Sequence, residues 1–198
     1  VNDHVRLRLS LWYAAATGAL CMIPFLSVLL ADAGLSDRAV ATTLALLPAG
    51  SLVSGPLWSW VADRTGTPRL ILVGTTAATL VAAVSMGFVE GALGLAGLIL
   101  LFAVARAPHF PLADAITVRV LPGGREAYGA VRRWGSLAYL SAVALSGWMR
   151  GSLPSAPLVV ASVMLVAMGA ASVLLPPPPV TERPPAGAAL RALAENHG

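Results

Sequence analysis

The sequence predicts an all-α, polytopic membrane protein with six transmembrane helices, and three observations lead to this fold class. First, hydrophobic residues make up 57% of the 198-residue chain and charged residues only 11%, with a mean hydropathy of +0.79. A soluble domain of this length needs far more charge to cover its surface. Second, apolar runs of about 20 residues, the length that crosses a bilayer as a helix, alternate with short polar turns. Third, the arginines gather in alternate turns.

The first three spans are predicted over residues 9–30, 39–61 and 70–89. Pro24 predicts a kink inside the first span. Trp12 and Tyr13, near one end of that span, are typical of the aromatic belt at a membrane interface. The polar turn that follows offers Ser36 or Asp37 as the cap of the second span. The third span is uncharged and rich in small residues, which permit close helix approach.

The other three spans are predicted over residues 93–120, 134–149 and 157–175. We expect the longest internal loop over 121–133, although the fifth span could begin at Gly129. Four consecutive prolines after the sixth span forbid helix continuation. The sequence therefore divides into a six-helix bundle over 1–175 and a Pro-rich cytoplasmic segment over 176–198. Two sets of three spans are also the unit from which inverted-repeat transporters are built.

The distribution of arginine predicts that both termini are cytoplasmic. With the N-terminus inside, the inner segments contain Arg6, Arg8, Arg64, Arg69, Arg119, Arg125, Arg132, Arg133, Arg183 and Arg191. The outer turns contain only Arg38 and Arg150. Because short cytoplasmic loops carry the excess of basic residues, we predict a multi-pass protein of the cytoplasmic (inner) membrane, surrounded by the lipid bilayer. Since the arginines sit between apolar spans, we predict no nucleic-acid partner.

The fourth span contains the ionisable residues Arg106, His109 and Asp114. An arginine at the centre of a membrane helix costs about 2.5–3.5 kcal/mol and rarely faces lipid. Pro108 and Pro111 bracket the histidine, and each removes one backbone hydrogen bond. We therefore expect this helix to line a substrate or ion path. The alternative is that its polar groups serve helix packing, with Asp114 near the inner interface.

Enzymatic chemistry is not predicted. The sequence contains no Gly-x-Ser-Gly nucleophile motif, no paired Asp motif and no His cluster with metal-ligand spacing. A single cysteine, Cys21, excludes an internal disulfide. We therefore predict no enzyme, no cofactor and no metal site.

The charged loop expected over 62–69 reads Ala-Asp-Arg-Thr-Gly-Thr-Pro-Arg. It resembles the signature loop between helices two and three of the major facilitator superfamily, in which Ala-Asp-Arg-x-Gly is followed by a basic residue. Asp63, Arg64 and Gly66 match directly, while Arg69 comes one place later than the usual basic residue. The resemblance implies that these four residues form a gating loop. The alternative is that the charges only set topology.

A second resemblance involves residues 111–115, Pro-Leu-Ala-Asp-Ala, together with residues 128–136. They look like the branch that contains phenylpropionate-type permeases and nucleoside–proton symporters, with the lactose permease as a more distant relative. The likeness covers residues 7–175, whereas the complete family fold has twelve helices. It implies the N-terminal half of that fold, a 3+3 inverted repeat, and a second six-helix half from a missing part or a partner chain. It also favours Arg132 over Arg133 as the functional arginine.

We therefore predict a secondary active transporter, coupled to protons, that moves a small organic solute by alternating access. Arg106 is predicted to engage the substrate, and Asp114 or His109 to carry the coupling proton. Arg132 is expected to enter the same pathway. Interfacial anchoring is expected for three tryptophans, Trp58, Trp60 and Trp134. The alternative function is a non-transporting structural or assembly membrane protein on the same scaffold.

Overall fold

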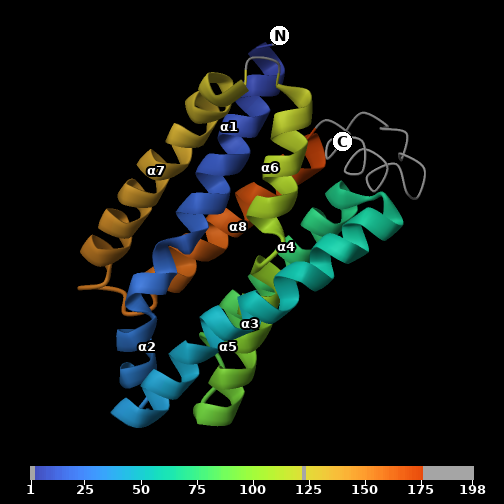
Figure 1. The fold of residues 1–198 in the computed structure, drawn as a ribbon. Coiled ribbons are helices and arrows are strands. Elements are labelled where there is room, and N and C mark those ends of the chain that lie inside the picture. Colours follow the sequence, from blue (N-terminus) through green and yellow to red (C-terminus); the bar gives the residue numbers. More distant parts are fainter. Residues whose placement is uncertain (1–2, 122–123, 176–198) are drawn as a thin grey trace, which may run out of the picture.

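The computed structural model describes residues 3–121 and 124–175, and nearly all of them are helical (Figure 1). The elements are α1 (Asp3–Gly18), the 3-10 helix η1 (Ala19–Phe25), α2 (Leu26–Asp32), α3 (Asp37–Thr65), α4 (Pro68–Ser85), α5 (Ala92–Arg106), α6 (His109–Val120), α7 (Gly124–Met149) and α8 (Ala156–Leu174). Because the described ranges contain no strand, the predicted all-α class is confirmed. The predicted segment 176–198 lies outside the described residues.

Five stretches of the described chain are long and apolar enough to cross a membrane: Asp3–Asp32, Asp37–Thr65, Pro68–Ser85, Ala92–Val120 and Ala156–Leu174. Helix α7 is not among them, because arginines and a glutamate occupy its first turns and small polar residues interrupt its apolar half. It is nevertheless 26 residues long. At 1.5 Å per residue, this is roughly 39 Å, enough to cross a bilayer.

Both ends of the described bundle lie on the same side. Arg8 Nη1 donates a hydrogen bond of 3.4 Å to the Leu174 carbonyl, so the start of α1 lies beside the end of α8 (Figure 1). At the opposite end, Arg150 forms an ion pair with Asp32 and joins two turns that were predicted to share one side. A chain that starts and ends on one side crosses an even number of times. Helix α7 is therefore the sixth crossing, and the six-helix prediction is confirmed.

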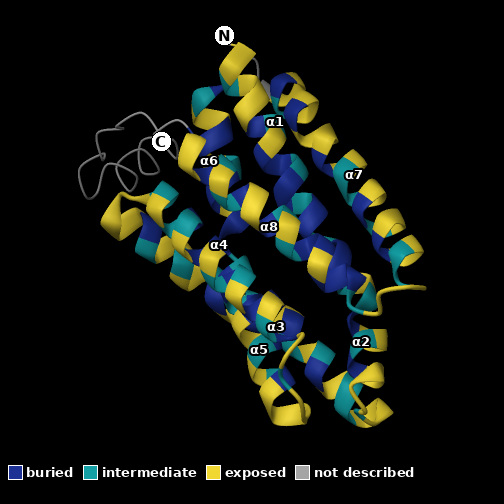
Figure 2. Ribbon diagram, turned by 180° about the vertical axis from the view of Figure 1, so that it is seen from behind, coloured by how far each residue is buried: buried dark blue, intermediate teal, exposed yellow. Residues whose placement is uncertain are grey.

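Helix α1 packs between α7 and α8, which buries most of its circumference. In Figure 2, the buried residues gather along α1 and α8, whereas α3 and α7 show exposed residues on their outer faces. The side chains of Trp12 and Tyr13 are both 0% exposed. Their predicted place in an interfacial belt is therefore wrong, because the packing of α1 encloses the end of the span on which they lie.

A proline and a serine determine two helix boundaries in the first part of the chain. Pro24 lies within η1, so the predicted kink is a short 3-10 stretch between α1 and α2. The Ser36 hydroxyl accepts the backbone N–H of Ala39 at 3.4 Å, which makes Ser36 the cap of α3. These two predictions from the sequence are confirmed.

The turn between α3 and α4 is shorter than the loop predicted over 62–69. Helix α3 continues through Thr65 and therefore includes Asp63 and Arg64 in its last turn. It ends at Gly66, whose φ of 66° is the left-handed conformation that glycine adopts most easily. The Gly66 N–H donates to the Ala62 carbonyl at 2.9 Å and closes the helix. Gly66 thus ends the helix, and most of the loop predicted around it is helix.

The long loop predicted over 121–133 is also wrong. Helix α7 begins at Gly124, so Arg125, Arg132 and Arg133 all lie on it. Arg, Glu and Ala have high helix propensity, and this composition extends the helix beyond the apolar residues by which the span was located. The consequence is that these arginines have fixed directions around a helix.

Candidate functional site

The predicted fourth span is one membrane crossing made of two helices, α5 and α6, with a break at residues 107–108. Pro108 has no N–H, so the Val104 carbonyl loses its helical donor. The Trp58 indole Nε1 donates to that carbonyl at 2.9 Å, and the Ser54 hydroxyl lies 3.5 Å from it. The prediction that Trp58 is an interfacial anchor is therefore wrong, because its N–H is used inside the bundle.

Arg106 is the last residue of α5 and contacts α3. Its Nη2 donates to the Ser51 hydroxyl at 3.3 Å, and that hydroxyl lies 3.4 Å from the Ala103 carbonyl. The guanidinium carbon lies 6.0 Å from the centroid of the Phe102 ring. Its Nε is buried and has no hydrogen-bond partner within the described ranges. Arg106 is thus held to α3 through its Nη2, while its buried Nε is left without a partner among the described residues.

His109 begins α6 and is only 3% exposed. Its Nε2 is the second buried side-chain nitrogen without a hydrogen-bond partner among the residues described. The backbone of Thr75, in α4, interacts with the ring. The predicted pathway residues Arg106 and His109 therefore lie close together at the break.

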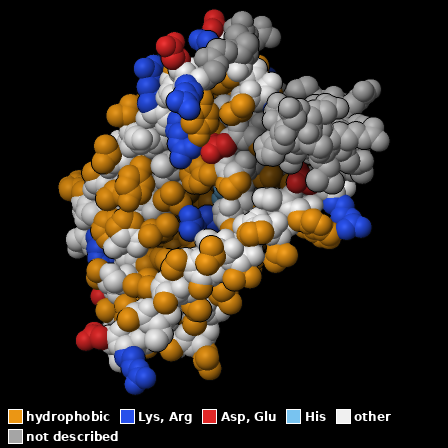
Figure 3. Space-filling view, viewed as in Figure 1, with side chains coloured by type: hydrophobic (Ala, Val, Ile, Leu, Met, Phe, Trp, Pro, Cys, Tyr) orange, Lys and Arg blue, Asp and Glu red, His pale blue; other side chains and the backbone are white. Residues whose placement is uncertain are grey.

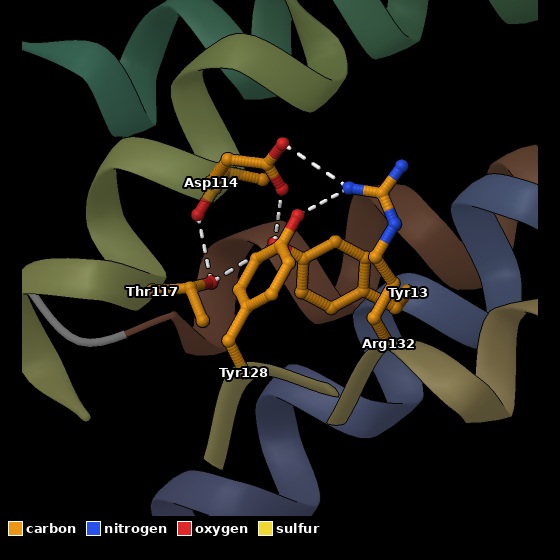
Figure 4. A network of polar contacts seen from close by, with 6 residues as sticks. Tyr13, Asp114, Thr117, Tyr128 and Arg132 are labelled. Atoms are coloured by element: carbon orange, nitrogen blue, oxygen red, sulfur yellow. Dashed lines mark hydrogen bonds and ion pairs between the residues drawn. The ribbon is translucent and has the colours of Figure 1, made fainter. Parts of the chain in front are cut away.

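A separate polar cluster joins α1, α6 and α7 (Figure 4). The Tyr13 hydroxyl lies 2.5 Å from Asp114 Oδ1 and 3.2 Å from Thr117 Oγ1. Arg132 Nη1 lies 3.3 Å from Asp114 Oδ2 and also donates to the Tyr128 hydroxyl. The Arg132 and Asp114 side chains are 49% and 32% exposed, so a solute can reach both. We call these five residues the Asp114 cluster.

Aromatic rings surround the charged pair. The Arg132 guanidinium carbon lies 5.7 Å from the centroid of Phe110 and 5.6 Å from that of Tyr128. Behind them, Trp12 and Tyr13 meet edge to face with centroids 5.2 Å apart. The cluster therefore combines a carboxylate, a guanidinium and aromatic faces, which together can bind a ring that carries hydroxyl groups.

A cavity of about 600 Å³ adjoins the cluster, and it is lined by Asp114, Ala115, Thr117, Val118, Arg119, Leu121, Arg125 and Tyr128. This volume lies within the range of roughly 300–1,000 Å³ that is usual for small-molecule sites. Figure 3 shows hydrophobic side chains over much of the face in view, with charged side chains near the N-terminal end, at the opposite end and along the edges. An isolated basic group lies in the middle of the hydrophobic area. The polar groups are thus few and localised.

Glycine at position 135 lets α7 approach α1 closely. A Cβ at Gly135 would lie 2.6 Å from Thr17 Oγ1 and 3.1 Å from the Tyr13 carbonyl oxygen. Arg132 lies three residues earlier on α7, on the same side of the helix. The close approach of the two helices therefore brings Arg132 to the carboxylate that Tyr13 also holds.

The residues of the predicted gating loop lie at the turn between α3 and α4. The Arg64 guanidinium carbon is 4.9 Å from the centroid of Trp60. Arg69 lines a cavity of about 430 Å³ together with Gly66 and neighbouring residues. None of the four predicted gating residues belongs to the Asp114 cluster, and their gating role stays a prediction.

Three members of the cluster, Tyr13, Thr117 and Tyr128, were not predicted from the sequence. Tyr128 precedes Arg132 by four residues, a spacing at which two side chains meet on a helix. That spacing would have indicated the contact had the helix been predicted to begin early enough. No comparable signal identifies Tyr13, whose partners lie about a hundred residues away in the chain.

Comparison with known proteins gives the family. A model of the MFS_1 like family, a group within the major facilitator superfamily, matches residues 6–187. This chain belongs to that family. It is also 34% identical over 139 residues to the maltose permease of Geobacillus stearothermophilus, a match that covers 68% of this chain and 34% of the permease. The chain therefore spans about a third of the length of that relative.

Membership in this family confirms the resemblance to the major facilitator superfamily, and it agrees with a multi-pass, all-helical fold. The resemblance to the branch of phenylpropionate-type permeases and nucleoside–proton symporters stays a prediction. The relative is named as a permease, which is a transport protein and not an enzyme.

Proposed function

We propose that this chain forms one six-helix bundle of a secondary active transporter that moves a small organic solute across the cytoplasmic membrane by alternating access. The observation that carries this function is the Asp114–Arg132 ion pair, part-exposed beside a cavity on helices of a membrane bundle. Ionisable groups inside membrane spans are expensive and are functional by default.

The chemistry of the cluster favours a hydroxyl-rich solute. The Asp114 carboxylate accepts hydrogen bonds and the Arg132 guanidinium donates them, so together they match both properties of a hydroxyl group. The rings of Phe110 and Tyr128 offer apolar faces to the carbon skeleton of the solute. The name of the relative, maltose permease, supports the same class. Arg106, which is only partly buried, is a second candidate for contact with the solute.

The partners of Asp114 support the proposal that transport is coupled to protons. Proton uptake by this carboxylate removes its charge and weakens its ion pair with Arg132. The guanidinium donors are then free for the solute, so the proton and the solute favour the same state. His109 is the other candidate, but its burial leaves it without the access to solvent that Asp114 has.

A complete transporter would need a second six-helix bundle, from a further part of the protein or from a partner chain, to close the other wall of the site. Both termini would be cytoplasmic, as the arginine distribution predicts. In this arrangement, Asp63, Arg64, Gly66 and Arg69 would hold or release neighbouring helix ends on the inner side as the bundles move.

The test is equilibrium binding and proton-driven uptake of radiolabelled maltose by the complete transporter in proteoliposomes. Arg132→Ala should abolish binding, whereas Asp114→Asn should bind the sugar yet fail to accumulate it against a gradient. Arg106→Ala is expected to fold and insert but to lose affinity. The matched control is Arg133→Gln, since Arg133 lies over Trp134 and outside the cluster.

Native uptake by both cluster variants would remove the cluster from the transport pathway. Loss of folded protein in both, with no change in binding by the protein that remains, would favour the alternative function of a structural or assembly protein.

A further inference from the structure

We propose that Trp58 is a positioning residue for α6: its indole N–H replaces the backbone donor that Pro108 removes, and it thereby sets the direction of the helix that carries Asp114. The proposal deepens the transport function proposed above and rests on it for its consequence. The contact itself can be tested without transport.

Trp58 is the principal donor to the freed carbonyl. Its Nε1 lies 2.9 Å from the Val104 oxygen, which is the usual length of an N–H···O bond. The Ser54 hydroxyl lies 3.5 Å from the same oxygen but only 2.6 Å from the Gly50 carbonyl. A hydroxyl has one proton to donate, and the shorter bond takes it.

Helix α3 has one face that suits this contact. Ser51, Ser54 and Trp58 are spaced so that they share a side of the helix, and all three contact carbonyls of α5. A Cβ at Gly50 would lie 2.9 Å from the Cβ of Ala103, so glycine there allows the two helices to approach. The face that holds the end of α5 therefore combines close backbone approach with donors at the correct positions.

The direction of α6 beyond the break decides whether the Asp114 cluster forms. Asp114 lies six residues after Pro108, which is about 9 Å along the helix. A change in helix direction of about 10° at the break would therefore move it by about 1.6 Å. The bonds from Asp114 to Tyr13 and Arg132 are 2.5 and 3.3 Å long, and a shift of this size would break either one.

The first measurement is amide hydrogen exchange of the complete protein in nanodiscs. Trp58→Phe keeps an aromatic ring but loses the N–H. We expect exchange over residues 112–120 to become about 3- to 10-fold faster, the factor that loss of one net hydrogen bond supplies. The control is Trp148→Phe on α7, whose ring is 81% exposed, and it should leave α6 unchanged.

The second measurement is a double-mutant cycle. Pro108→Ala restores a backbone donor for Val104, so Trp58→Phe in that background should no longer accelerate exchange in α6. Equal acceleration in both backgrounds, or none in the single variant, would overturn the proposal. If the single variant does not fold, rescue by Pro108→Ala supports the bond, and failure of the double variant to fold contradicts it.

Uptake by the same variants separates the positioning role from the proposed function. Faster exchange in α6 together with weaker maltose binding supports both the positioning role of Trp58 and the proposed transport function. Faster exchange in a protein whose wild type does not transport maltose leaves the contact established and removes only that function. Faster exchange with unchanged uptake shows that the direction of α6 does not serve the site, and this would contradict the positioning role.

Discussion

At the scale of single residues, Asp114 divides its two oxygens between partners of different kinds. Oδ1 lies against the neutral Tyr13 hydroxyl, while Oδ2 faces the Arg132 cation. The tyrosine is fully buried, whereas the arginine is half-exposed. Tyr13 is therefore suited to hold the carboxylate in place, and Arg132 is the partner that a solute or a proton can displace.

This division predicts that Tyr13→Phe affects stability and function together. The variant removes one buried hydroxyl and leaves Asp114 Oδ1 without its donor, so we expect a loss of about 1–3 kcal/mol in stability. The measurement is thermal unfolding of the purified protein, followed by solute binding. Tyr139→Phe, on α7, is the control, because no hydrogen bond of its hydroxyl is present in the described chain. Equal stability of the two variants would show that the Tyr13–Asp114 bond contributes nothing.

At the scale of elements, the site depends on how closely α7 approaches α1. Substitution of two glycines on α7 tests this dependence. Gly135→Ala places a methyl group 2.6 Å from Thr17 Oγ1, and overpacking of this kind costs about 1–3 kcal/mol. Gly129→Ala on the same helix meets nothing within 4 Å and should stabilise the helix by about 0.5–1 kcal/mol. Opposite shifts in melting temperature are expected, with maltose binding weakened only by the first. Shifts of the same sign would mean that the close approach does not constrain α7.

The way in which the helices form and pack explains what could and could not be predicted from the sequence. Apolar runs located the spans, since burial in lipid needs only hydropathy and length. They missed the N-terminal end of α7, where Arg132 lies, because that part is held by helix propensity and not by apolarity. Pro108 predicted a missing backbone hydrogen bond. That the Trp58 indole supplies the substitute donor could not be predicted, because the contact depends on packing between α3 and α5. Asp114 was predicted by its charge inside an apolar span and Arg132 by the family resemblance, whereas Tyr13 at the end of an apolar span was indistinguishable from an interfacial residue.

At the scale of the whole molecule, the Arg8–Leu174 contact requires an even number of crossings, yet only five stretches of the described chain are long and apolar enough to cross on their own. The difference rests on α7, whose polar residues would be costly against lipid on all sides. Its contacts with α1 and α8 cover part of this surface. We therefore expect α7 to cross the membrane only as part of the assembled bundle.

Topology reporters test this expectation, together with the orientation that the arginines predict. Fusions at Gly91, Gly124 and Gly151 fall in or beside the turns before α5, before α7 and after α7. With the N-terminus inside, Gly91 and Gly151 should report the outside and Gly124 the inside. At Gly151 the reporter is not a terminal fusion, because that would remove α8. It is inserted between α7 and α8 of the otherwise intact chain. If the insertion at Gly151 reports the same side as Gly124, α7 does not cross, and the six-helix bundle is wrong. If all three signals are reversed, the bundle stands but its orientation is inverted.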